Sequence, residues 1–205
     1  MRGEFQINRT ALRRAGFTVV ELAVAVVITS LVFAAAAALY MNGIDMMRRG
    51  EVETGAVASV RNALTVMMHD VRLSASVVPS AVIGGTNYTS GADTVVLKIP
   101  SSDGTRLRFT EFDYVAYKLL NGALIQANAP ASGSVRPGGV RTLIPYGVTT
   151  LSFSYFTASG SPTSDWALVA GVEARIVVSR QAQKGTVVVS DAQRASLMNF
   201  GLSGG

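Results

Sequence analysis

The side chains that most often carry out chemistry in proteins are few in this sequence. It contains one histidine, His69, and no cysteine, so thiol catalysis and cysteine-ligated metal sites are excluded. Its 13 acidic residues are scattered and show neither a general acid–base pair nor the spacing of a metal site. A lone histidine without spaced partners is most often structural. We therefore expect no catalytic residue, no metal and no cofactor, and the sequence does not favour an enzyme.

One carboxylate lies in an unusual place, because Glu21 stands at the start of a long apolar run. The next 20 residues, 22–41, carry no charge (LAVAVVITSLVFAAAAALYM), and this is about the length that spans a bilayer. An ionised carboxylate among apolar side chains is costly unless it gains a partner. Glu21 therefore needs a positive group, and no Lys or Arg lies close to it after residue 16.

The basic residues are concentrated before the apolar run. The net charge is +5, of which the first sixteen residues contribute +3, from Arg2, Arg9, Arg13 and Arg14 against Glu4. Positive charge before an apolar span stays on the cytoplasmic side, so we expect a single-pass protein whose chain after residue 41 has crossed the membrane. The excess of positive charge thus indicates the orientation of the chain in the membrane and gives little support to nucleic-acid binding.

The residues at this junction, RRAGFTVVELAVAVV, resemble the signature of type IV prepilins. Basic residues precede Gly16, Phe17 follows it, and Glu21 is the fifth residue counted from Phe17. The resemblance is to the superfamily of type IV pilins, pseudopilins and competence pilins. It implies that a prepilin peptidase cuts between Gly16 and Phe17 and N-methylates the new amine of Phe17.

Cleavage at this point would supply the positive group that Glu21 lacks. The new amine of Phe17, in the same subunit or in a neighbour within a filament, could pair with the Glu21 carboxylate. Glu21 is therefore a predicted docking residue for assembly. The alternative is a plain signal anchor in which Glu21 lies near the lipid headgroups.

Four segments follow from these patterns: a leader (1–16), a transmembrane and assembly half of a long helix (17–41), an amphipathic half (42–75) and a β-rich head with a flexible C-terminal end (76–205). Apolar residues in the amphipathic half recur at steps of three and four, at Val57, Val60, Leu64, Met67, Met68 and Val71. The opposite face carries Arg48, Arg49, Glu51, Glu53, Arg61 and Arg72. Near the helix end, Asp70 and Arg72 are expected to cap the helix or pair locally.

The head reads as mostly antiparallel sheet. Residues 77–93 are rich in Ser, Gly, Pro and Thr and are expected to form a connecting loop. Asn121-Gly122 predicts a tight hairpin turn, and alternation places Leu151, Phe153 and Tyr155 on one buried face. Trp166, in a polar loop, is the aromatic residue expected to be most exposed. Strands are predicted at 94–99, 107–109, 114–120, 123–128, 142–144, 148–156, 172–179 and 186–190.

The order of YKLLNGALIQ, TLIPYGVTTLSFSYF and VEARIVVS resembles the heads of J-type pseudopilins and PilW-like minor pilins. Many major pilins carry a proline about twenty residues after the cut, which is lacking here, and this favours a minor subunit. The resemblance implies an α+β, pilin-like fold, with the long N-terminal helix packed on the sheet. It also implies a minor pilin or pseudopilin that assembles into a type IV pilus or a type II secretion pseudopilus, at the tip or initiation complex.

The same resemblance implies a set of partners and a location. The partners are the prepilin peptidase, other minor pilins or pseudopilins, the major pilin, an inner-membrane assembly platform and, before assembly, the lipid bilayer. The protein would lie in the bacterial inner membrane with its head in the periplasm, and afterwards in the filament.

A competence pilin that contacts DNA is the alternative function. Its base-stacking platform would come from Phe109, Phe112, Tyr114, Tyr117, Phe153, Tyr155 and Phe156. These rings alternate with other apolar residues, and no dense Lys/Arg stripe runs through them. Most of them are therefore expected in the core.

Overall fold

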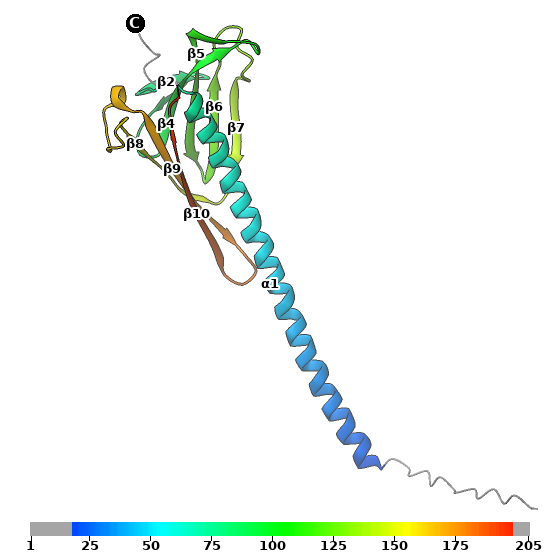
Figure 1. Ribbon diagram of the computed structural model, residues 1–205. Helices are drawn as coiled ribbons and strands as arrows, with labels where there is room; N and C mark the ends of the chain where they lie inside the picture. Colours follow the sequence, from blue (N-terminus) through cyan, green and yellow to red (C-terminus); the bar gives the residue numbers. More distant parts are fainter. Residues whose placement is uncertain (1–17, 199–205) are drawn as a thin grey trace, which may run out of the picture. The chain divides into compact units, whose positions relative to one another are not determined.

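The computed structural model describes residues 18–198 (Figure 1), and the chain divides into two compact units between Met46 and Met47. The chain begins with one long helix, α1, and continues as strands. The predicted flexible end at 199–205 lies outside the described residues. The elements are α1 (Val19–Leu73), β1 (Ser76–Val77), β2 (Ser80–Ile83), β3 (Thr86–Thr89), β4 (Thr94–Ser102), β5 (Leu107–Leu120), β6 (Ala123–Ala129), β7 (Gly139–Ile144), β8 (Val148–Phe156), a short 3₁₀ turn η1 (Trp166–Leu168), β9 (Gly171–Gln181) and β10 (Thr186–Ser196).

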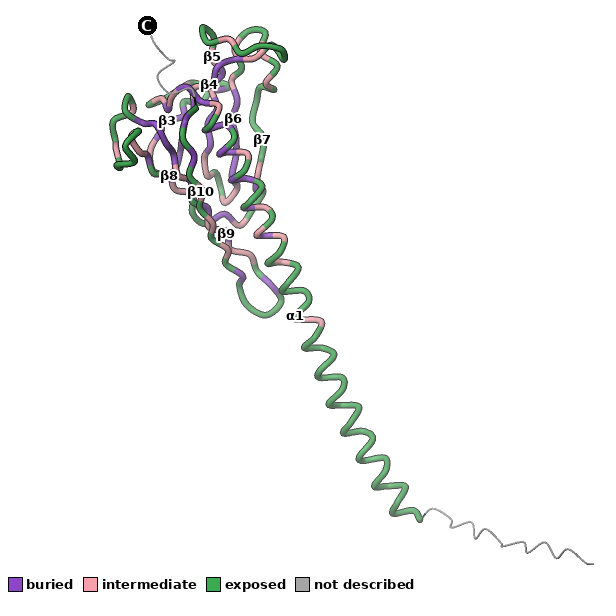
Figure 2. The backbone as a smooth tube through the Cα atoms, in the orientation of Figure 1, coloured by how far each residue is buried: buried purple, intermediate pink, exposed green. Residues whose placement is uncertain are grey.

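The first unit is the N-terminal part of α1, and its surface is apolar and exposed. An 18-residue window of α1 has a mean hydropathy of 2.6, and none of that window is buried within the protein. Figure 2 shows this stretch as continuously exposed backbone. By length and composition, α1 is able to cross a membrane, as the 22–41 run predicts.

In the second unit, the remainder of α1 buries one face. Val60, Leu64, Met67, Met68 and Val71 are all 2% exposed or less, which confirms the predicted apolar stripe except that Val57 is only partly buried. The helix ends at Leu73 rather than near residue 75, because Ala75 already donates its N–H to the Lys98 carbonyl at 2.8 Å and so joins the sheet.

Every strand pair in the head is antiparallel, as predicted, but the strands form three sheets. One has the order β1-β4-β5-β6-β7, one has β10-β9-β8, and β2 and β3 form a separate hairpin. Buried residues of α1 and of both larger sheets belong to one hydrophobic cluster. The predicted α+β architecture, with the long helix packed on antiparallel sheet, is therefore confirmed.

The hairpin and the half-buried strand are where the sequence places them. Asn121 and Gly122 take φ values of 51° and 75°, as a type I′ turn requires. Leu151, Phe153 and Tyr155 on β8 are 4%, 6% and 8% exposed. The two short strands expected at 107–109 and 114–120 are instead one continuous strand, β5.

The loop predicted for 77–93 is wrong, since this segment contains part of β1 and the β2–β3 hairpin. Gly84 and Gly85 turn the hairpin with φ values of 58° and 82°. Ile83 and Tyr88 on its two strands are buried in a second, smaller apolar cluster. The strands were missed because four-residue runs with few large apolar side chains give a weak pattern.

Several aromatic residues lie in environments that differ from those expected from the sequence. Trp166 is half-buried rather than exposed, and its ring meets that of Tyr155 edge to face at 4.9 Å. Of the seven candidate stacking rings, three are buried, Phe112 lies under Lys98 at 4.0 Å, and Phe156 lies under Arg194 at 3.6 Å. The expectation that most of these seven rings lie in the core is therefore wrong, because Phe109 is exposed and three others are only partly buried.

The turn before β8 requires glycine at one position. Gly147 has φ +82°, and a Cβ built there would lie 2.7 Å from the Ser179 carbonyl oxygen. We expect Gly147→Ala to lower the free energy of unfolding by about 3 kcal/mol, because strain and clash add. Gly185→Ala is the matched control, with φ +92° and open space around the Cβ, and it should cost about 1–2 kcal/mol. Urea unfolding of the full chain in detergent measures both, and equal losses would contradict the close approach.

Candidate functional site

The start of α1 is closed by a capping box. Thr18 precedes the first helical residue, and Glu21 stands at the third helical position. The Glu21 Oε2 atom accepts from the Thr18 N–H and from the Thr18 hydroxyl, both at 2.9 Å, while the Glu21 N–H donates to Thr18 Oγ1 at 3.2 Å. The carboxylate therefore has a local structural role at the helix start.

The helix surface after Glu21 is suited to an apolar environment. Its Thr and Ser side chains fold back on the helix, since Thr29 donates to the Ala25 carbonyl at 2.7 Å and Ser30 to the Val27 carbonyl at 2.8 Å. Neither hydroxyl then needs water as a partner. The remaining side chains of 22–41 are apolar and exposed, so this surface requires lipid or another protein to cover it.

Of the site residues predicted from the sequence, two precede residue 18, where the described structure begins, and one follows it. Gly16 and Phe17 lie outside the described residues, so cleavage and methylation stay predictions. Glu21 is described, and its partner is Thr18. Thr18 was missed by the sequence reasoning, although a Thr-x-x-Glu pattern before an apolar run is a recognised helix-start signal.

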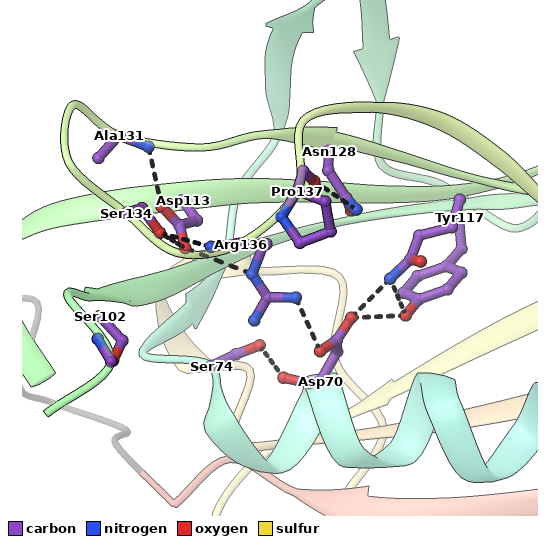
Figure 3. A network of polar contacts seen from close by, with 12 residues as sticks. Asp70, Ser74, Ser102, Asp113, Tyr117, Asn128, Ala131, Ser134, Arg136 and Pro137 are labelled. Carbon is purple, nitrogen blue, oxygen red and sulfur yellow. Dashed lines mark hydrogen bonds and ion pairs between the residues drawn. The ribbon is translucent and has the colours of Figure 1, made fainter.

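A second polar site lies in the head, where the Asp70 carboxylate faces the sheet (Figure 3). Asp70 is on α1 and is 4% exposed. Its Oδ2 accepts from the Tyr117 hydroxyl at 2.7 Å and from Gln126 Nε2 at 2.8 Å. Gln126 Nε2 also donates to the Tyr117 hydroxyl at 2.8 Å, which closes a triangle between α1, β5 and β6.

Arg136 joins this triangle to a second buried carboxylate. Its guanidinium reaches Asp70 Oδ1 at 3.1 Å and Asp113 Oδ2 at 3.3 Å. Asp113 also accepts from the Ala131 N–H at 2.8 Å and from the Ser134 hydroxyl at 2.9 Å. The loop between β6 and β7 is therefore attached to both the helix and β5 (Figure 3).

The electrostatics of this cluster favour the bonded state. Burial, followed by the neighbouring Asp70 carboxylate, raises the pKa of the Tyr117 hydroxyl well above its ordinary value, while Arg136 opposes that shift. Tyr117 therefore keeps its proton and remains a donor to Asp70. Buried carboxylates are tolerated when hydrogen bonds and a counter-charge surround them, as they do here.

The expectation that Asp70 caps the helix or pairs locally is wrong. Asp70 lies on the buried face of the helix, three residues after Met67 and next to Val71, and its partners are 47 to 66 residues away in sequence. Its position on the apolar stripe was the available signal, since a charge at a buried position requires partners. The identity of those partners depends on strand register, which the sequence pattern does not supply. Arg72, by contrast, is exposed, as predicted for the polar face.

The described residues offer no group of three or more His, Cys, Asp or Glu side chains that could hold a metal. His69 is exposed beside Asp70 on α1. The Asp70 cluster is saturated with internal partners, and its arrangement attaches helix, sheet and loop to one another.

Removal of the Asp70 charge tests this assignment. We expect Asp70→Asn to lower the free energy of unfolding by about 3 kcal/mol, because an amide places donors against the donors of Tyr117 and Gln126 and withdraws a counter-charge from Arg136. Arg72→Gln, two residues along the helix and exposed, should change it by less than about 0.5 kcal/mol. Chemical unfolding of the full chain in detergent compares them, and a silent Asp70→Asn would refute the structural role.

Comparisons with known proteins give one match to the N-terminal sequence and further matches to the fold. A family model for the prokaryotic N-terminal methylation motif matches residues 12–37. Among curated proteins, none matches the sequence significantly. A type IV-like pilin from Thermus thermophilus shares the fold with a TM-score of 0.53 at 9% identity, over 70% of this chain and 96% of that one.

Two further solved structures match with lower scores. One is a complex of two pseudopilins from the type 2 secretion system of Vibrio vulnificus, with a TM-score of 0.42 at 14% identity, over 67% of this chain and 92% of that one. The other is a three-protein complex of the type 2 secretion system of enterotoxigenic Escherichia coli, with a TM-score of 0.38 at 17% identity, over 65% and 94%. The chain thus carries a prokaryotic N-terminal methylation motif at residues 12–37 and has a pilin-like fold.

Proposed function

We propose that this protein is a minor pilin or pseudopilin, a structural subunit that assembles through α1 into a type IV pilus or a type II secretion pseudopilus. The observation that carries the proposal is the exposed apolar surface of α1, which directly overlaps the methylation motif. A helix of this kind needs lipid before assembly and the helices of other subunits afterwards. The head would lie in the periplasm while α1 is in the inner membrane.

Processing supplies the assembly signal in this proposal. The prepilin peptidase cuts between Gly16 and Phe17 and methylates the new amine of Phe17. That amine becomes the positive group for Glu21, in the same subunit or in a neighbour. The pairing selects one register of helix against helix, because an unpaired carboxylate in an apolar environment is costly.

The capping box is compatible with docking. Both Thr18 donors reach Oε2 of Glu21, and among the described residues no hydrogen bond to Oε1 is seen. Oε1 is then available to accept from an incoming amine while Oε2 holds the helix start. A carboxylate fixed by two local bonds also loses less side-chain freedom when the amine arrives.

A place at the tip or initiation complex is the finer part of the proposal. The chain contains no proline between residue 17 and Pro79, in contrast to the proline that many major pilins carry early in the helix. Its partners would then be other minor subunits, the major pilin and the inner-membrane assembly platform.

Intact mass and N-terminal sequencing test the processing step. The protein from cells with prepilin peptidase should begin at Phe17 and carry one added methyl group. The protein from cells without the peptidase should keep all sixteen leader residues. An intact leader in both strains, or a cut after the apolar run, would make the chain an ordinary anchored or secreted protein.

Substitutions at the capping box separate the docking role of Glu21 from its local role. We expect Glu21→Gln to lose most incorporation into sheared filaments, because the amide oxygen can still cap the helix but carries no charge. Thr18→Val removes the cap and keeps the charge, so it should incorporate at near the parent level. Immunoblots of filament and membrane fractions give the ratio. Parent-level incorporation of Glu21→Gln and of Glu21→Ala would reject the docking role.

A further inference from the structure

The three-stranded sheet of the head ends on one side in β10, which pairs with β9 alone. The register runs without interruption from Thr186 opposite Gln181 to Ser196 opposite Gly171. A strand in this position leaves half of its backbone N–H and C=O groups pointing away from the sheet, where another strand can pair with them. We call this row of groups the outer edge of β10.

Two hydrogen bonds just beyond the ends of the β9–β10 pairing show which groups point outward. The Ala182 N–H donates to the Gly185 carbonyl, and the Leu197 N–H donates to the Ala170 carbonyl, both at 2.9 Å. Bonded and non-bonded pairs alternate along an antiparallel ladder, so the odd-numbered residues between these two bonds face β9. The outer edge then belongs to the even-numbered residues of the strand: Thr186, Val188, Ser190, Ala192, Arg194 and Ser196.

The first half of β10 has the composition of a strand that pairs readily. Val187, Val188 and Val189 are consecutive β-branched residues, and the run from Thr186 to Ser190 carries no charge. Val188 is 64% exposed. No backbone hydrogen bond from another described segment reaches the outer edge. Composition and exposure therefore favour the addition of a strand here.

Asp191 is the residue of β10 that opposes an added strand. It lies directly opposite Ile176, whose side chain is fully buried, so both side chains are on the core-facing side of the sheet. Asp191 itself is only partly buried, because β10 is the last strand of the sheet. A charged side chain that points inward from an edge strand is one of the features that keep such edges unpaired. The other residues of β10 on this side are uncharged: Val187, Val189, Gln193 and Ala195.

The contacts of the Asp191 carboxylate show what an added strand would cost. Its Oδ1 accepts from the Ala192 N–H at 2.8 Å, and this N–H is one of the donors on the outer edge. In the part of the chain that the structure describes, no Lys or Arg lies within ion-pair distance of this carboxylate. An added strand would compete for the Ala192 N–H and exclude water from the carboxylate. An ionised carboxylate enclosed without a counter-charge is costly.

We propose that Asp191 prevents the outer edge of β10 from pairing with the β10 strand of a second copy of this chain. In such an antiparallel pair, the core-facing rows of the two strands lie on the same side. The second copy would bring no counter-charge to that side, because Asp191 is the only charged residue in its own row. Both carboxylates would be enclosed together. This role goes beyond the assembly proposed for α1, because every residue in it belongs to the head.

Cross-linking of the full chain in detergent micelles tests the proposal. The chain contains no cysteine, so Val188→Cys places a single thiol on the outer edge of β10. Val82→Cys on β2 is the matched position, since the two valines are 64% and 67% exposed. A flexible bis-maleimide joins copies whose thiols are close, and denaturing gels give the rate of dimer formation. We expect Asp191→Asn to raise that rate at least about fivefold with Val188→Cys and to leave it unchanged with Val82→Cys.

Two further variants control for the carboxylate and for the net charge. Asp191→Glu keeps the carboxylate and should cross-link at the parent rate. Glu53→Gln makes the same change in net charge at an exposed position of α1 and should also leave the rate unchanged. An unchanged rate in Asp191→Asn would overturn the proposal, and so would an equal rise in Glu53→Gln or an equal rise at the Val82→Cys thiol.

Discussion

A buried carboxylate on a helix imposes a demanding constraint, because each of its acceptor positions must meet a donor that the fold has placed there. Asp70 receives those donors from β5, from β6 and from the loop after β6. The register of β5 with β6 pairs Tyr117 with Gln126, so both side chains reach the same oxygen. A shift of either strand by one residue would turn that strand's side chain away from α1. The cluster therefore fixes the register of the sheet and the position of the helix end together.

The two parts of the long helix have different surfaces, one apolar and exposed and one with a single buried face. In the second unit it buries a stripe with the ordinary pattern of three- and four-residue steps. In the first unit its apolar residues surround the whole helix, and the Thr29 and Ser30 hydroxyls donate to carbonyls of the preceding turn. The change occurs within one continuous helix, so the sequence encodes it through the composition of each part and the spacing of its apolar residues.

Composition and periodicity were sufficient for much of the fold. The uncharged run, the apolar stripe and Asn121-Gly122 are local signals, and the structure confirms each. The β2–β3 hairpin was missed because its strands are short and polar, and Trp166 was misplaced because its partner Tyr155 is remote in sequence. The Asp70 cluster depends on long-range pairing, which no local pattern contains. The methylation motif was predictable because it is a short, contiguous pattern that does not depend on long-range contacts.

The contact of Arg136 with Asp70 and Asp113 also has a mechanical consequence. It connects positions that are 66 and 23 residues apart in a chain that contains no cysteine. A disulfide would close such loops permanently but would need an oxidant to form again after rupture. The ion pairs of Arg136 with Asp70 and Asp113 break under mechanical force and form again when the force is removed, without any covalent reaction. A head pulled open by force would thus recover its fold in an oxidising or a reducing environment alike.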